Sequence, residues 1–233
     1  MKINKPYMMA KSGPVYRVKS MSMITQPRIE TMDWAADAPW LSICFKPAPL
    51  RRGRVPKFKI SSGYNPVLWC SSVKSLQVTA QPVMAEGISS RLPENLAELK
   101  KVYHQGYLSY VKEWGKKLGP AFIKNAAKYE ADYLPKSKSL IVFRHGAPCG
   151  LFSHVAYTDI FKKKYAHITW HNLLPGLSAA EKRAARYQAA LWLKKTVKKP
   201  VSVTLDLFEK ESYDFFAGLG LVASRLLLER RKK

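Results

Sequence analysis

Two histidines on one predicted strand are the side chains best suited to accept a proton. His167 and His171 are four residues apart in the apolar stretch Tyr165–Leu174, and the alternation of side chains along a strand would put both on one face, with Thr169 between them. Imidazole titrates near neutral pH, so such a pair can act as a base, bind a metal, or be an ordinary packed or solvated pair. No third residue of a metal-binding type lies near them in the sequence, so we expect no metal site.

The start of the next helix offers backbone N–H groups to an anion. The strand ends in Leu173-Leu174-Pro175, and Gly176-Leu177-Ser178-Ala179-Ala180-Glu181 leads into a helix predicted over Ser178–Val197. Unpaired N–H groups and the positive end of a helix dipole bind phosphates. Ser178 and Glu181 also match the S-x-x-E capping box, whose side chains occupy two of these N–H groups. The pattern therefore predicts either an anion site or a helix capped by its own residues.

The apolar pattern predicts a mixed α/β architecture around these groups. Alternation indicates strands, whereas helical spacing and stop signals indicate helices. The expected strands are Trp40–Phe45, Pro66–Cys70, Ser75–Ala80, the hairpin Ser139–Phe143 and Gly150–Val155, Tyr165–Leu174, Val201–Leu207 and Leu221–Leu228. The expected helices cover Pro93 to about Leu118, Ala121–Tyr133, Ser178–Val197 and Lys210–Ala217.

The stretch Glu209–Leu221 resembles the GNAT superfamily of acyl-coenzyme A N-acyltransferases. Ser212 stands at the family's small position, Phe215-Phe216 at its aromatic pair and Leu219-Gly220-Leu221 at its closing triplet. Together with the order of the elements, the resemblance covers residues 76–233. It implies an α/β fold with a mixed, mostly antiparallel central sheet flanked by helices. It also implies the transfer of an acetyl or other acyl group from coenzyme A to an amine.

The resemblance implies a cofactor site between the strands that end near Leu174 and Leu207. The pyrophosphate of acetyl-coenzyme A, or of another acyl-coenzyme A, is expected at Gly176–Ala180. The residues expected to bind this cofactor are Leu173, Leu174, Gly176, Leu177, Ser178, Ala179, Ala180 and Glu209. The chain departs from the family here, because the loop has only one glycine and Glu209 stands where the family has asparagine.

The resemblance also suggests which residues would move protons. The family's general-acid tyrosine aligns with Phe216, which cannot donate a proton. Tyr213, three residues earlier on the helix, is therefore the candidate acid, and its alternative role is that of a core aromatic. His171 is the candidate base that deprotonates the amine, directly or through a water.

A net charge of +24, from 40 basic and 16 acidic residues, attracts nucleic acid, anionic lipid or a phosphorylated cofactor. Residues 1–75 carry a net charge of +10, residues 76–135 +2 and residues 136–233 +12. The run Arg51–Lys59 contains Phe58 and precedes Tyr64 and Trp69, a mixture typical of surfaces that hold a single nucleic-acid strand. No helix-turn-helix, zinc-finger, KH or RNP signature accompanies it. The alternative to an enzyme is therefore a diverged GNAT-like fold that binds nucleic acid or a partner protein without catalysis.

Composition limits the domain organisation and the location. We expect a basic extension at residues 1–75 and a GNAT-like domain at residues 76–233. The hydrophobic content of 47% excludes global disorder, and no apolar run approaches the roughly 20 residues that a membrane span needs. Three scattered cysteines without a CxxC pair indicate a reducing compartment, and we expect the cytoplasm.

Overall fold

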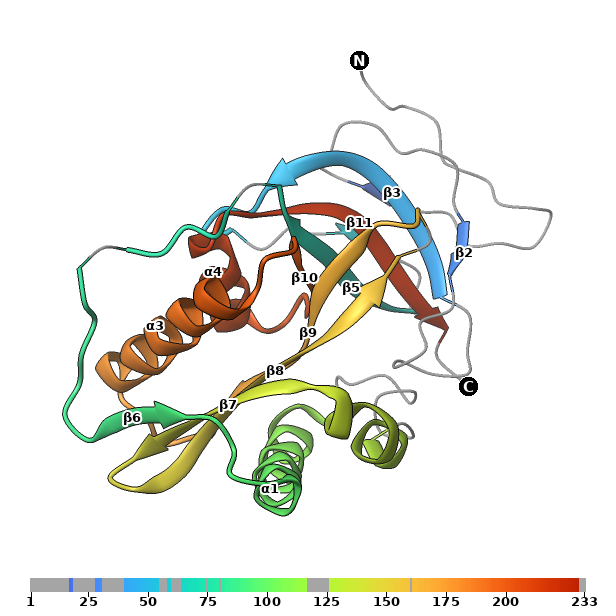
Figure 1. The fold of residues 1–233 in the computed structure, drawn as a ribbon. Helices are drawn as coiled ribbons and strands as arrows, with labels where there is room; N and C mark the ends of the chain where they lie inside the picture. The colour runs from blue at the N-terminus through green and yellow to red at the C-terminus, as the bar shows by residue number, and fades with distance from the viewer. Residues whose placement is uncertain are drawn as a thin grey trace.

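Nine strands of the described residues form one sheet, with helices against both of its faces (Figure 1). The computed structural model describes residues 17–18, 28–30, 40–54, 58–59, 64–73, 75–79, 81–116, 126–159 and 161–230. The order across the sheet is β2-β3-β11-β5-β10-β9-β8-β7-β6. Its strands are β2 Arg28–Glu30, β3 Trp40–Pro49, β5 Tyr64–Ser72, β6 Ile88–Arg91, β7 Lys138–Arg144, β8 Ala147–Thr158, β9 Lys164–Leu173, β10 Val201–Asp206 and β11 Leu221–Arg230. Two further strands, β1 Arg17–Val18 and β4 Phe58–Lys59, pair with each other.

The sheet is mixed because β9 and β10 run parallel. All other neighbouring strands in the described part of the sheet are antiparallel. The predicted fold class, an α/β fold with a mixed, mostly antiparallel central sheet flanked by helices, is therefore confirmed.

The helices divide between the two faces of the sheet (Figure 1). One face packs against α3 (Ala179–Thr196) and α4 (Lys210–Gly218), and the other against α1 (Leu96–Trp114). On the α1 side, residues 126–128 are helical and lead into the π-helix η1 (Tyr129–Tyr133) and the 3₁₀-helix η2 (Leu134–Lys136). The rest of the predicted second helix, up to residue 125, lies outside the described residues. No helix within the described ranges combines the length and apolar composition needed to cross a membrane.

Strand β7 contributes side chains to both helix layers. Leu140 and Val142 belong to the core cluster with α3 and α4, whereas Ile141 and Phe143 belong to the cluster with α1. Successive side chains of a strand point to opposite faces, so a strand covered on both sides is apolar throughout. The predicted hairpin of β7 and β8 is confirmed, and its turn passes through Gly146 at a φ of 80°.

Strand β5 lies inside the sheet, between β11 and β10. Its residues Leu68, Trp69 and Cys70 are at most 1% exposed. Residues before 76 thus supply strands to the same sheet as the later residues, and the division expected at residue 75 does not coincide with a boundary of the sheet. The strand predicted from residue 75 is absent over residues 75–79. The N–H of Gln77 donates instead to the carbonyl of Leu219, at 3.0 Å.

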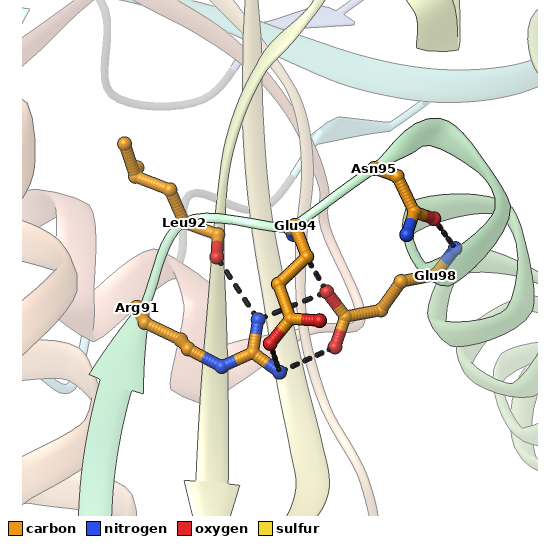
Figure 2. A network of polar contacts seen from close by, with 5 residues as sticks. All are labelled: Arg91, Leu92, Glu94, Asn95 and Glu98. Atoms are coloured by element: carbon orange, nitrogen blue, oxygen red, sulfur yellow. Dashed lines mark hydrogen bonds and ion pairs between the residues drawn. The ribbon is translucent and has the colours of Figure 1, made fainter.

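Helix α1 begins in a network of polar side chains next to β6 (Figure 2). The N-cap residue Asn95 accepts a hydrogen bond through Oδ1 from the N–H of Glu98, at 2.9 Å. The guanidinium of Arg91 donates to both carboxylate oxygens of Glu98, at 2.9 and 2.6 Å. These bonds lower the pKa of Glu98 to about 2. The network ties the start of α1 to β6, and the far end of α1 carries Tyr110 to the site described next.

Candidate functional site

The parallel strands β9 and β10 pair at their beginnings and then part. Residues Ala166–Ile168 pair with Val201–Val203. Beyond that point β9 continues to Leu173 beside β8, and β10 continues to Asp206 beside β5. The facing edges of their carboxyl halves therefore form no ladder with each other, which leaves backbone N–H and C=O groups for other partners. In α/β sheets, ligands bind outside the carboxyl ends of parallel strands where neighbouring connections diverge.

A β-bulge in β9 alters which side chains face this region. Ser153 of β8 lies opposite Trp170, but the next residue, His154, lies opposite Ile168. Thr169 is therefore an extra residue in β9. An extra residue reverses the alternation of side chains beyond it, because the period of a strand is two residues.

The bulge gives the two histidines different surroundings. His167 is fully buried, with Nδ1 2.9 Å from Oγ of Ser202 and its ring stacked on Trp69 at 4.9 Å. Trp69 belongs to a cluster separate from the one with α3 and α4. His171 instead meets the ring of Phe216, on α4, edge-on at 5.1 Å. The prediction that His167, Thr169 and His171 share one face is therefore wrong, and His167 is a packed core residue.

His171 lies half-buried at the parting of the strands. Burial, together with the smaller effect of the positive charge of Arg186, lowers its pKa to about 4. The imidazole is consequently neutral at neutral pH, so it can accept a proton but is a weak base. Phe216, at the position of the family's tyrosine, is fully buried against this imidazole.

Two carboxylates and a tyrosine meet at the end of β10. Asp206 is the last residue of β10, and Glu209 is the N-cap residue of α4. The hydroxyl of Tyr110, from α1, donates to Oδ2 of Asp206 at 3.2 Å and also hydrogen bonds to Glu209. The ring of Tyr110 lies 6.1 Å from that of Trp170 in β9. Tyr110 thus contacts both strands at the place where they part.

Glu209 is a buried acid whose pKa is shifted. It is 8% exposed, and burial raises its pKa. Hydrogen bonds from Tyr110 and Ser212 and the charge of Arg186 oppose that rise. Arg186 acts on both Glu209 and His171, so one guanidinium lies within electrostatic range of both proton-accepting candidates. A buried carboxylate with a raised pKa at such a position is a candidate general base.

The start of α3 is capped by its own side chains. The N–H of Glu181 donates to Oγ of Ser178 at 3.2 Å, and the N–H of Ser178 donates to Oε2 of Glu181 at 2.6 Å. Arg144 pairs with the same carboxylate at 2.7 Å. The N–H groups of Ala179 and Ala180 have no hydrogen-bond partner within the described residues. Two of the four N–H donors at this helix start are therefore available to an anion.

The other residues expected at a cofactor lie along the chain from β9 to α3. Leu173 ends β9, and the N–H of Leu174 donates to the carbonyl of Cys149 at 2.8 Å. Leu177 is buried in the core with α3 and α4, so its side chain anchors the loop to the core. Gly176 has a φ of 90° and open space where a Cβ would stand. The exposed part of the loop therefore consists of Pro175, Gly176, Ser178, Ala179 and Ala180.

Replacing Ser178 with alanine is expected to lower the free energy of unfolding by about 1 kcal/mol, because the N–H of Glu181 loses its acceptor. Urea unfolding measures the change. Ser89→Ala, at an exposed position of β6, is the matched control and should stay within about 0.5 kcal/mol of the parent protein. An S178A variant as stable as the parent would contradict the capping role.

Tyr213 lies away from the parting of β9 and β10. It is buried, and its hydroxyl accepts a hydrogen bond from the N–H of Arg51 at 3.4 Å. Burial also raises its pKa. No hydrogen bond or ring contact joins Tyr213 to His171, both of which are described residues. Its role as an acid stays a prediction.

A small cavity lies between α1 and the end of β9. Its volume is about 10 Å³, which is room for a single water. Leu174 forms part of its wall, so it adjoins the strand end where the cofactor is expected. The cavity is too small for coenzyme A, which would have to lie along the strand edges. The walls are formed by Val102, Gly106, Gly150, Leu151, Trp170, Asn172 and Leu174.

Comparison with known proteins finds neither a matching family model nor a matching curated protein. Among solved structures, a GCN5-related N-acetyltransferase from Kribbella flavida is similar, at 12% identity and a TM-score of 0.43, over 74% of this chain and 60% of that one. A protein of unknown function from Staphylococcus epidermidis has 11% identity and a TM-score of 0.47, over 72% of this chain and 63% of that one. This chain thus spans less than two thirds of either.

A third similar structure is a putative acetyltransferase of the GNAT family from Novosphingobium aromaticivorans. It has 12% identity and a TM-score of 0.38, over 86% of this chain and 77% of that one. GNAT acetyltransferases are thus among the structures similar to this chain. Because the TM-scores are below 0.5, these similarities give no information about any reaction of this chain. Its function has to be inferred from its own residues.

Sequence reasoning missed Tyr110 and Asp206. Tyr110 lies 96 residues before Asp206 in the chain, and only the packing of α1 against the sheet brings them together. Asp206 does carry a signal, because it is an acid directly after the apolar strand Val201–Leu205. Polar residues at the carboxyl end of a parallel strand mark ligand sites in α/β sheets.

Proposed function

We propose that this chain transfers an acetyl or other acyl group from an acyl-coenzyme A to an amine. The observation that carries the proposal is the parting of β9 and β10 beside the buried carboxylate of Glu209. This geometry supports a site in which an elongated acyl donor lies between the carboxyl ends of β9 and β10. A group that can accept a proton lies next to it. The resemblance of Glu209–Leu221 to the GNAT pattern points to the same chemistry.

The residues present fit such a donor at the helix start and along the strands. The free N–H groups of Ala179 and Ala180 suit the pyrophosphate, and Arg144 offsets the negative charge of Glu181 nearby. The open surroundings of Gly176 let a ligand approach the backbone. The unpaired edges of β9 and β10 suit the amide groups of the pantetheine arm, which would bind as a strand does. When bound, coenzyme A supplies the acyl group as a thioester.

We assign the proton acceptor to Glu209. An amine is protonated at neutral pH and must lose a proton before it can attack a carbonyl carbon. A carboxylate oxygen of Glu209 takes that proton from the amine nitrogen, and the hydroxyl of Tyr110, which also meets Asp206, lies within hydrogen-bonding range of the carboxyl group. His171 is the second candidate for this role, and its pKa of about 4 makes it the weaker base.

The acceptor is an amine because of the charge at the site. The chain carries a net charge of +24, yet Asp206 and Glu209 lie together at the end of β10. Two carboxylates attract a cationic group such as an ammonium ion, and they would repel an anionic acceptor. A cytoplasmic location suits this reaction, and all three cysteines, Cys44, Cys70 and Cys149, are free thiols.

Calorimetric titration with acetyl-coenzyme A tests the proposal. We expect a saturable heat of binding at millimolar cofactor or below, and acetylated product by mass spectrometry when an amine panel is added. Adenosine diphosphate is the control, because it shares the pyrophosphate and lacks the acyl arm. No heat with acetyl-coenzyme A, or equal affinity for both ligands, would overturn the proposal, since equal affinity would reflect only the positive charge of the chain.

A further inference from the structure

The turn that follows β3 is held in place by α4. The N–H of Arg54 donates to the carbonyl of Arg51 at 3.1 Å, and Gly53 has a φ of 72°, which closes a tight turn. The N–H of Gly53 donates to Oδ1 of Asp214 at 2.7 Å, and the N–H of Arg51 donates to the hydroxyl of Tyr213 at 3.4 Å. The backbone of residues 51–54 is therefore fixed by side chains of α4.

The turn presents three exposed arginines that lack carboxylate partners. Arg51, Arg52 and Arg54 are exposed, and none of them forms an ion pair with any residue that the structure describes. Four other described arginines are paired. These are Arg91 with Glu94 and Glu98, Arg144 with Glu181, Arg186 with Glu211, and Arg225 with Asp159.

Of the three arginine side chains, that of Arg52 lies beside the end of α4. Its guanidinium packs against Gly218, and a side chain at position 218 would collide with it. Gly218 is the last residue of α4, where the negative end of the helix dipole favours a cation.

The basic run continues beyond the turn. Strand β4, Phe58–Lys59, begins four residues after Arg54 and therefore within about 14 Å of it along the chain. Its register with β1 pairs Lys59 with Arg17.

We propose that the turn Arg51–Arg54 binds the phosphate backbone of a nucleic acid. Arginine matches phosphate with two parallel N–H donors, and several such contacts in a row follow a chain of phosphates. The surface binds through charge and not through stacking on Trp69, because Trp69 is 1% exposed and lies under the guanidinium of Arg225 at 4.1 Å. This binding does not depend on the proposed acyl transfer.

A nucleic acid fits this surface better than a membrane does. A peripheral membrane site needs apolar side chains beside its cations, usually on an amphipathic helix. Here the three exposed arginines lie on a turn. None of the large apolar side chains exposed among the described residues belongs to the turn itself; they are Val73, Met84, Leu92, Leu96, Leu108, Phe161 and Leu191.

Fluorescence anisotropy with a labelled 20-nucleotide single-stranded RNA over a range of salt concentrations tests the proposal. The variant R51Q/R52Q/R54Q removes three charges from the turn. Its slope of log affinity against log salt should become shallower by about 2, since each contact to a single strand contributes about 0.7. The matched control K162Q/K163Q/K164Q removes three charges from the exposed residues at the start of β9 and just before it, and should bind as the parent protein does.

Two further measurements, RNA binding by a charge-conserving variant and binding to lipid vesicles, distinguish phosphate recognition from a general effect of charge and from membrane binding. The variant R51K/R52K/R54K keeps the charge and loses the paired donors, so it should fold, keep the salt slope and bind several-fold more weakly. Equal losses in the glutamine variant and the Lys162–Lys164 control would overturn the proposal, because only total charge would then matter. A glutamine variant that loses binding to phosphatidylserine vesicles and keeps its affinity for RNA would also overturn it. Unchanged acetyl-coenzyme A binding in that variant would support a surface separate from the cofactor site.

Discussion

Replacing Glu209 with glutamine is expected to lower kcat/KM for amine acetylation by about 10²- to 10⁴-fold, which is the usual contribution of a positioned general base. The amide keeps the size of the side chain and can still meet Tyr110, but it cannot accept the proton. Acetyl-coenzyme A binding, measured by calorimetry, should stay unchanged. Glu211→Gln is the matched control, because Glu211 is an exposed acid two residues away that pairs with Lys182 and Arg186.

The pH dependence of kcat/KM distinguishes Glu209 from His171. The base acts in its deprotonated form, so the rate rises with pH up to the pKa of the base and then levels off. Burial raises the pKa of Glu209 above the usual carboxyl value, whereas burial lowers that of His171 to about 4. A rise well above pH 4.5 that disappears in E209Q identifies Glu209. A rise near pH 4 that persists in E209Q would contradict this assignment and favour His171.

The same substitution should stabilise the protein at neutral pH. The pKa of Glu209 is raised in the folded state, so between its unfolded and folded values the folded protein holds one more proton than the unfolded chain. The free energy of unfolding therefore falls as pH rises through this window. Glutamine carries no such charge, so E209Q should lose that part of the pH dependence in urea unfolding. A variant that is less active but more stable is expected when a functional residue is kept at a cost to the stability of the fold.

Replacing Asp159 with asparagine is expected to lower the free energy of unfolding by about 3 to 5 kcal/mol. Asp159 pairs with Arg225 at 3.4 Å, and their side chains are only 2% and 3% exposed. The Arg225 guanidinium also lies over the ring of Trp69 at 4.1 Å, so it cannot turn out to solvent without leaving that stack. The asparagine side chain can still accept the 2.9 Å hydrogen bonds from the N–H groups of Phe161 and Lys163, so the loop keeps its contacts while the buried charge loses its carboxylate.

Urea unfolding of D159N and of Glu94→Gln measures this effect against a control. Glu94 pairs with Arg91 at 3.2 Å, but the two side chains are 70% and 41% exposed. An exposed ion pair contributes about 1 kcal/mol or less. A D159N variant no less stable than E94Q would show that the Asp159–Arg225 pair does not stabilise the fold.

Local patterns predicted most of the elements from residue 93 onward. Strands β7 to β10 and helices α3 and α4 begin and end within a few residues of their predicted bounds, because their hydrophobic periods and stop signals lie within the segments themselves. The capping box of Ser178 and Glu181 also forms as predicted. The segment at residues 75–79 has the alternation of a strand and forms none, since a strand also needs an unpaired neighbour in the sheet.

The sequence predicted only some of the residues of the candidate site. From the family resemblance, Glu209 was expected only as a cofactor-binding residue and His171 as the base; the role of Glu209 as a proton acceptor was not predicted. The bulge at Thr169, which turns His171 away from His167, arises from pairing between β8 and β9 and has no signature in β9 alone. Tyr110 enters the site because α1 packs across the ends of β9 and β10, a contact between residues far apart in the chain.

For this protein, the sequence by itself determined the order of the elements, the cap of α3 and the excess of positive charge. Each of these depends on residues within one segment or on composition, so no distant partner can change it. The tertiary structure alone decided that β5 lies inside the sheet, that Glu209 and Asp206 share Tyr110, and that α4 holds the arginine turn. These features depend on which segments meet, and burial then shifts the proton affinity of the groups enclosed between them.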